Sequence, residues 1–227
     1  MPDARVLRQR QEKTKEGGNM LADVVTPEVL TERKLNYRIA SLLVDRWSPR
    51  SMTGEPMADE ELFPLFEAAR WAPSSYNCQL WRFIIARRQS RVEFDRFFSL
   101  LTPGNQVWTK NAAAPVVVAS RTRFEYNDKP SITHSFDAGA AWENLALEAT
   151  SRELVAHAME GFDYERAKTE LSIPNDFDVN AMIAIGRRAP AENLPDKYRT
   201  MERPSLRRPL HEIVFEGAFG QQIPGLP

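Results

Sequence analysis

Cysteine is nearly absent from this chain, and histidine is scarce. The 227 residues include a single cysteine, Cys78, and three histidines that stand far apart, His134, His157 and His211. One cysteine excludes an intrachain disulfide and a cysteine-based zinc cluster, and the isolated histidines lack the spacing of a metal site. The sequence therefore predicts no metal, and any redox chemistry would need a bound cofactor.

Long hydrophobic runs and an excess of one charge are also absent. The most apolar runs, such as Ala112–Ala119, are far shorter than the roughly 20 residues that span a bilayer, and the N-terminus lacks the apolar core of a signal peptide. Lys and Arg number 30 against 31 Asp and Glu, a balance that disfavours binding to nucleic acid or to an anionic membrane surface. We therefore expect a cytoplasmic protein whose partners are small molecules and a second copy of itself.

The composition, 42% hydrophobic with 10% aromatic residues, is sufficient for a sizeable core. We predict a single domain over residues 21–216. Residues 1–20 carry many charges and few large apolar groups, so they cannot offset the entropy of ordering by burial, and we predict a disordered tail there. Residues 217–227 are predicted to form a C-terminal tail.

Hydrophobic periodicity predicts helices that alternate with strands. The predicted helices are one or two over Pro27–Val44, then Asp59–Trp71, Arg91–Leu101, Ser135–Leu154 and Asp163–Leu171. The predicted strands are Trp81–Ala86, the β-branched and central Pro115–Ser120, Ala181–Gly186 and a strand-like run at Ile213–Phe215, with a turn at Thr102–Asn105. This pattern indicates an α/β or α+β fold with a central sheet covered by helices.

A basic segment follows the first predicted helices. Arg46, Ser48 and Arg50 lie within five residues. Arginine presents a planar fork that pairs with two phosphate oxygens, and serine adds a compact donor. Taken alone, the segment fits an ordinary solvated basic turn better than a binding site, because charged loop residues are usually on the surface.

Two further segments carry groups that could bind a flat ligand. The loop Ala72–Trp81 is rich in side chains that hydrogen-bond the edge of a heteroaromatic ring, although its Ser and Asn residues could equally satisfy their own backbone. In Met159–Asp163, a glycine stands next to an acid ahead of a predicted helix. Glycine lets the backbone approach a ligand closely, while a plain turn between two helices is the competing interpretation.

The order of these segments resembles that of the nitroreductase-like family of FMN-dependent NAD(P)H oxidoreductases. The resemblance covers residues 36–216. No single motif is specific to this family, but the whole set of motifs, in this order and with natural spacing, is specific to it. The segments that carry the resemblance are Arg46–Arg50, Ala69–Phe83, Ala114–Ala119, Asp137–Ala149, Met159–Asp163 and Ile183–Gly186.

The resemblance implies an α+β fold in which helices surround a central, mostly antiparallel sheet. It also implies an interlocked homodimer with FMN bound at the subunit interface. NADH or NADPH would supply electrons to small flat acceptors such as nitroaromatics or quinones, in a ping-pong hydride mechanism. Two rival functions remain open: another reaction on the same fold, such as dehalogenation, double-bond reduction or flavin breakdown, or a non-catalytic FMN-binding protein.

The resemblance also implies roles for individual residues, none of them a catalytic nucleophile. Arg46, Ser48 and Arg208 would hold the FMN phosphate, and Arg50 the pyrimidine edge of the flavin. The backbone of Glu160 and Gly161, next to Met159, would face flavin N5. The remaining assignments are Gln106 at the ring edge and Pro73, Ser74, Ser75 and Asn77, which would reach across the dimer interface.

The sequence departs from the family pattern in three places. Arg152-Glu153-Leu154 stands where many relatives have a Gly-Leu-Gly turn, and Leu80 stands where they often have proline. The segment before Leu35 has no counterpart in the family pattern, so the resemblance assigns it no role. The resemblance does not identify which of Phe124, Tyr126 or Phe136 would cover the flavin.

Overall fold

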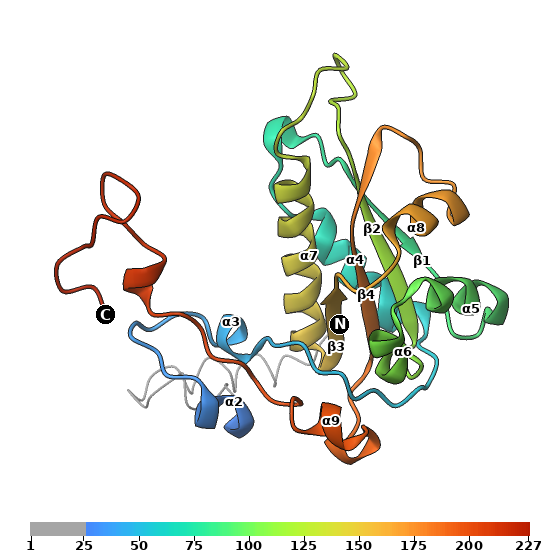
Figure 1. The fold of residues 1–227 in the computed structure, drawn as a ribbon, viewed down its shortest axis with the longest axis horizontal. Helices are drawn as coiled ribbons and strands as arrows, with labels where there is room; N and C mark the ends of the chain where they lie inside the picture. Colours follow the sequence, from blue (N-terminus) through green and yellow to red (C-terminus); the bar gives the residue numbers. More distant parts are fainter. Residues whose placement is uncertain (1–25) are drawn as a thin grey trace, which may run out of the picture. The chain divides into compact units, whose positions relative to one another are not determined.

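The computed structural model describes residues 26–227, and the tail predicted for residues 1–20 lies outside that range. The described residues form two compact units. The larger is Ser48–Arg203, and the smaller joins residues 26–47 to Pro204–Pro227. Each is described separately below, and Figure 1 shows the chain coloured along its sequence.

The larger unit is built on a four-stranded, entirely antiparallel sheet (Figure 1). Its strand order is β1-β2-β4-β3, so that β1 and β3 are the edges. The predicted strands in the larger unit are confirmed, and the sheet with its surrounding helices confirms the α+β class. The strands are β1 (Trp81–Ile85), β2 (Ala114–Arg121), β3 (Leu154–Met159) and β4 (Phe177–Arg187).

Side chains of the two central strands alternate between the faces of the sheet, as strand geometry requires. Val117 of β2 and its partner Met182 of β4 belong to one core cluster, and Val116 and its partner Ile183 belong to the other. Both faces are therefore buried. The first cluster packs under α5 (Arg91–Leu100), α6 (Pro103–Thr109) and α8 (Tyr164–Glu170), and the second under α4 (Asp59–Arg70) and α7 (His134–Ser151).

Two predictions for the larger unit are corrected by the structure. The segment 102–105 is the start of α6 and not a turn, because Pro103 occupies the first helical turn, where its missing N–H costs nothing. The long helix ends at Ser151, and Leu154 already begins β3. Glu153 makes the connecting turn with a left-handed φ of 59°, a conformation that few residues other than glycine adopt.

The smaller unit has less regular structure. Where one or two helices were predicted over 27–44, the structure has two short ones, α2 (Pro27–Glu32) and α3 (Ser41–Asp45). Buried Val29 and Val44 pack together, with Trp47 against them. The predicted strand at Ile213–Phe215 is wrong: this run follows a short 3-10 turn, η3 (Leu210–Glu212), and pairs with no strand among residues 26–227.

An ion pair joins the start of α4 to the end of β4. Glu61 accepts hydrogen bonds from both the backbone N–H of Ala58, at 3.1 Å, and Nη2 of Arg187, at 2.5 and 2.6 Å. The N–H of Ala58 and then the Arg187 guanidinium lower the pKa of Glu61 below its ordinary value. This pair therefore holds the capped end of α4 against the sheet.

We predict that Glu61→Gln flattens the acid limb of the stability curve. A carboxyl whose pKa is lowered by folding stabilises the native state above its unfolded pKa, and this contribution is lost as the pH falls through the folded pKa. The melting temperatures of the wild type and of Glu61→Gln, measured between pH 3 and 7, test this prediction. The difference between the two temperatures should shrink as the pH falls. Parallel curves would show that the Glu61 carboxylate contributes no pH-dependent stability.

Candidate active site

The backbone around Arg50 is held by side chains from distant parts of the chain. The N–H groups of Arg50 and Ser51 donate to the buried carboxylate of Glu202 at 2.9 to 3.0 Å. Nδ1 of His157, on β3, lies 2.9 Å from the carbonyl oxygen of Pro49. A carbonyl oxygen only accepts, so this nitrogen carries the proton. The segment is thereby fixed on both sides of Arg50.

Two side chains of this segment, those of Ser48 and Arg50, are available to a ligand. The Ser48 hydroxyl and the Arg50 guanidinium are half-buried and have no hydrogen-bond or ion-pair partner among residues 26–227. Arginine keeps its charge at any ordinary pH. A fixed backbone that carries an unpaired guanidinium presents a positive charge to an electron-rich group.

The loop Met159–Asp163 joins β3 to α8, so the interpretation as a turn between two helices is wrong. The carbonyl oxygen of Gly161 accepts three hydrogen bonds at 3.0 Å, from the N–H and hydroxyl of Thr102 and from the side-chain amide of Asn105. A Cβ at position 161 would lie 2.6 Å from the Asn105 amide nitrogen. A side chain at position 161 would therefore displace the Asn105 and Thr102 groups that tie the loop to the start of α6.

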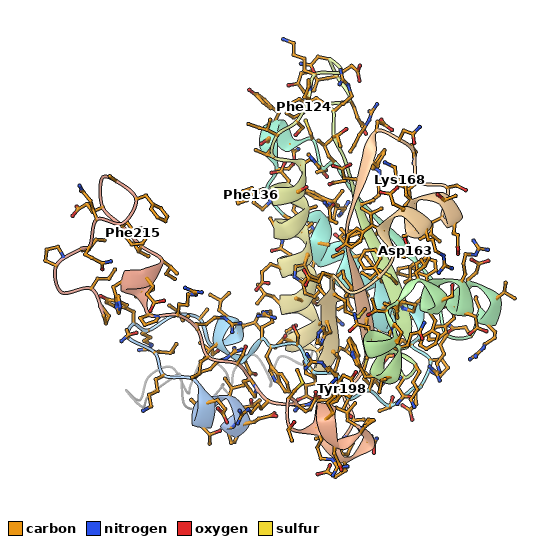
Figure 2. All side chains as sticks on the ribbon, in the orientation of Figure 1. Phe124, Phe136, Asp163, Lys168, Tyr198 and Phe215 are labelled. Atoms are coloured by element: carbon orange, nitrogen blue, oxygen red, sulfur yellow. The ribbon has the colours of Figure 1, made fainter. Side chains whose placement is uncertain are left out.

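Two backbone donors of this loop are unused. The N–H groups of Glu160 and Gly161 have no acceptor among the described residues. Asp163, labelled in Figure 2, ends the loop as the N-cap of α8 and accepts from the N–H of Arg166 at 3.0 Å. Two adjacent N–H groups on a fixed loop can donate to a ligand atom that bears a lone pair.

Gln106 lies near this loop, on α6. Its amide nitrogen donates to the carbonyl oxygens of Leu101 and Phe98, at 3.0 and 3.2 Å, and so satisfies the end of α5. In this conformation only the amide oxygen of Gln106 is available to accept from a ligand.

The loop 72–80 is anchored to the start of α7. The N–H of Ser75 donates to the buried carboxylate of Asp137 at 3.0 Å, and its hydroxyl lies 2.7 Å from that of Thr133. The Ser74 hydroxyl accepts from the N–H of Gln79 at 3.0 Å. The polar groups of Ser74 and Ser75 are thus largely hydrogen-bonded within the chain. Pro73 and Asn77 are exposed.

This loop has an unusual backbone. Tyr76, Asn77 and Gln79 take positive φ values of 54°, 54° and 49°. Few residues other than glycine adopt such values, which cost energy unless the surroundings impose them. The bonds from Ser75 to Asp137 and Thr133 contribute to that support.

One chain does not bring all of the predicted residues together. The loop 72–80 is attached to α7, which covers the sheet face shared with α4, whereas Gly161 is attached to the α5–α6 connection over the other face. No hydrogen bond joins the two loops within the described part of the chain. The chain therefore holds the two candidate loops on different helical layers of the sheet.

Arg208 belongs to the smaller unit, where its side chain is 78% exposed and lies 3.5 Å from the Glu212 carboxylate. Arg207 instead donates to the Ser205 carbonyl and hydroxyl oxygens, at 3.2 and 2.9 Å. The described residues include no group of three His, Cys, Asp or Glu side chains that could hold a metal ion. None of the described helices combines the length and apolarity needed to cross a membrane.

Sequence reasoning missed the residues that support the site. Glu202 lies about 150 positions from the N–H groups that it accepts from, and His157 is 108 positions from Pro49. Neither lies in a motif, and an isolated histidine usually indicates only a hydrogen-bonded structural residue. Of the three supporting residues Glu202, His157 and Asp137, only Asp137 lies in a segment that carries the family resemblance.

Proteins of known sequence and structure resemble this chain. DrgA of Synechocystis is 29% identical over 167 residues, which cover 62% of this chain and 78% of DrgA. A protein of Polynucleobacter asymbioticus, provisionally named an NADH dehydrogenase/NAD(P)H nitroreductase, is 25% identical over 70% of this chain and 87% of its own length.

Two solved structures share the fold over nearly their whole length. An oxidoreductase containing FMN is 43% identical, with a TM-score of 0.79, and the match covers 84% of this chain and 97% of the other. A provisionally assigned nitroreductase from Desulfovibrio desulfuricans, crystallised with FMN, is 26% identical, with a TM-score of 0.62 over 86% of this chain and 98% of the other. The model of the nitroreductase family matches residues 43–187, which are more than half of this chain. The chain therefore belongs to the nitroreductase family.

Proposed function

We propose that this chain is an FMN-dependent NAD(P)H oxidoreductase that reduces small flat acceptors such as nitroaromatics or quinones. The observation that carries the proposal is the set of unused donors, the Arg50 guanidinium and the N–H groups of Glu160 and Gly161, on supports that fix them in place. The FMN in two related structures supports the cofactor. The name of the Polynucleobacter relative supports NADH or NADPH as the electron donor.

The donor chemistry fits a flavin. A flavin ring offers lone pairs at N5 and along its pyrimidine edge, and FMN adds a phosphate. The Glu160 and Gly161 N–H groups suit the N5 atom, and Arg50 suits the pyrimidine edge. Arg46 and Ser48, close together in the sequence, suit the phosphate.

Bound FMN would supply hydride chemistry, and the protein's own residues would bind and polarise it. Arg50 places a permanent positive charge where negative charge develops on reduction, an electrostatic role that requires a fixed group. Glu202 and His157 fix it through the backbone. No nucleophile is needed, so NAD(P)H and the acceptor can use the same exposed face in turn.

The proposed active unit is a homodimer. Because the loop 72–80 and the loop around Gly161 are attached to opposite faces of the sheet, a ligand that contacts both needs a second copy of the chain. In this proposal, Pro73, Ser74, Ser75 and Asn77 of one subunit complete the flavin site of the other. Gln106 contributes its free amide oxygen at the ring edge.

An absorbance spectrum of the purified protein, recorded before and after anaerobic addition of NADH or NADPH, tests the proposal. We expect flavin bands that bleach with the nicotinamide and recover when a quinone or nitroaromatic is added. Bands that never bleach would indicate a non-catalytic flavin-binding protein. A colourless protein that takes up no FMN would refute the proposed function.

Arg50→Ala should weaken FMN binding by about 1.5 to 3 kcal/mol, the usual contribution of a hydrogen bond to a charged group. Fluorescence titration of the apoprotein measures the dissociation constant. The matched control is Arg91→Ala, which removes an exposed arginine paired with Asp95 on α5 and should leave FMN affinity unchanged. Equal affinities for all three proteins would remove Arg50 from the site.

Gly161→Ala should lower both thermal stability and FMN affinity, because the new methyl group would crowd the Asn105 amide and the Thr102 hydroxyl that bind the Gly161 carbonyl. The control is Gly104→Ala on α6, where a Cβ would make only an ordinary 3.6 Å contact with the Tyr198 hydroxyl. Alanine favours a helix over glycine by up to about 1 kcal/mol. A Gly161→Ala protein with unchanged melting temperature and FMN affinity would contradict this account of the loop.

A further inference from the structure

Glu202 binds the backbone of Arg50 and not its side chain. Oε1 of Glu202 accepts from the N–H groups of Arg50 and Ser51 at 3.0 and 2.9 Å, and Oε2 accepts from the N–H of Arg50 at 2.9 Å. The Arg50 guanidinium forms no ion pair with any of residues 26–227. Two opposite charges therefore lie at one residue of the chain without forming an ion pair.

The carboxylate of Glu202 is buried without a cation. The residue is 7% exposed, and no Lys, Arg or His side chain in the described part of the chain forms a hydrogen bond or ion pair with its oxygens. Removing an ionised carboxylate from water costs free energy, which hydrogen bonds from two N–H groups offset only in part. The chain thus keeps a negative charge where burial disfavours it.

Holding the backbone at Arg50 does not require that charge. A neutral amide oxygen also accepts from N–H groups, and Oε1 of Glu202 by itself accepts from both N–H groups here. In the same segment, the Ser51 hydroxyl donates to a neutral acceptor, the carbonyl oxygen of Pro190, at 2.6 Å. What the carboxylate adds to a neutral acceptor is its electric field.

This field acts on whatever Arg50 contacts. A carboxylate that is bonded to the N–H of a residue lies within the length of that residue's side chain, and a charge in a buried site is screened far less than in water. The Arg50 guanidinium favours extra electrons on a ligand, and the Glu202 carboxylate opposes them. The reduced state of a ligand at Arg50 is therefore favoured less than Arg50 alone would favour it.

We propose that Glu202 is a positioning residue for Arg50 whose negative charge also lowers the reduction potential of FMN bound there. This inference rests on the proposed function. In that function, NAD(P)H is oxidised as it gives two electrons and a proton to FMN. The acceptor then takes the two electrons with that proton and a second proton from solvent. A lower potential favours the second transfer over the first, so Glu202 sets the balance between the two half-reactions.

Two variants separate the charge of Glu202 from its hydrogen bonds. Glu202→Gln removes the charge and keeps an acceptor oxygen, whereas Glu202→Asp keeps the charge and shortens the reach to the N–H groups. The matched control is Glu60→Gln, which removes an equal charge from the exposed first turn of α4. Anaerobic titration against a reference dye measures the midpoint potential of bound FMN, and fluorescence titration of the apoproteins measures its dissociation constant.

We expect Glu202→Gln to raise the midpoint potential. A rise of about 30 mV corresponds to about tenfold tighter binding of reduced FMN relative to oxidised FMN. Glu202→Asp should weaken FMN binding, because Arg50 is held less well, and should keep the wild-type potential. Glu60→Gln should change neither quantity, because solvent and salt screen a surface charge.

An unchanged or lower potential in Glu202→Gln would overturn the inference. Equal rises in Glu202→Gln and Glu202→Asp would also overturn it, because the effect would then come from a displaced backbone and not from the charge. A wild-type protein that takes up no FMN would instead refute the proposed function itself. A wild type that binds FMN at the same potential as Glu202→Gln would refute only the effect of the Glu202 charge.

The double variant Arg50→Ala/Glu202→Gln provides an independent arm. If the Glu202 carboxylate acts on FMN through its field, its removal should raise the potential in the Arg50→Ala background as well. If Glu202 acted only by placing the Arg50 guanidinium, the potential of the double variant would equal that of Arg50→Ala, and the inference would be overturned.

Discussion

Burial of the central sheet on both faces is the constraint on which the larger unit depends. Every residue of β2 from Ala114 to Ser120 is buried, and so is most of the second half of β4. Such strands must be covered by helices on each side. As a result the loops that carry polar groups are confined to the ends and edges of the sheet, and they are attached to different helical layers. The separation of the loop 72–80 from the loop around Gly161 follows from the core and not from the loops themselves.

Sequence patterns predicted the elements that carry a clear local signal of a strand or a helix. The β-branched run in β2 and the acidic first turn of α4 gave strand and helix with nearly correct ends. β3 was missed because Leu154–Met159 continues the apolar spacing of α7 with residues common in helices, and only the tertiary turn at Glu153 separates them. Ile213–Phe215 has the composition of a strand but no neighbour to pair with among the described residues.

The sequence also identified the segments of the candidate site better than it identified their supports. Motifs are local, so Arg50, Gly161 and the loop 72–80 could be found by reading along the chain. The groups that fix them, Glu202 and His157, act over separations of more than 100 residues. Their importance depends on pairing with backbone groups whose positions only the fold determines. A single sequence contains no signal for such pairs.

In the smaller unit, Nε of Arg33 donates to the Ser205 carbonyl oxygen at 3.1 Å, and this bond bears on how the chain can be shortened. The two ends of the described chain are not independent appendages, because a side chain near one end donates to the backbone near the other. Cutting the chain before Ser205 would remove the carbonyl oxygen that accepts from Nε of Arg33. Residues 26–47 and 204–227 must therefore be kept or removed as a pair in any attempt to obtain a minimal folded form.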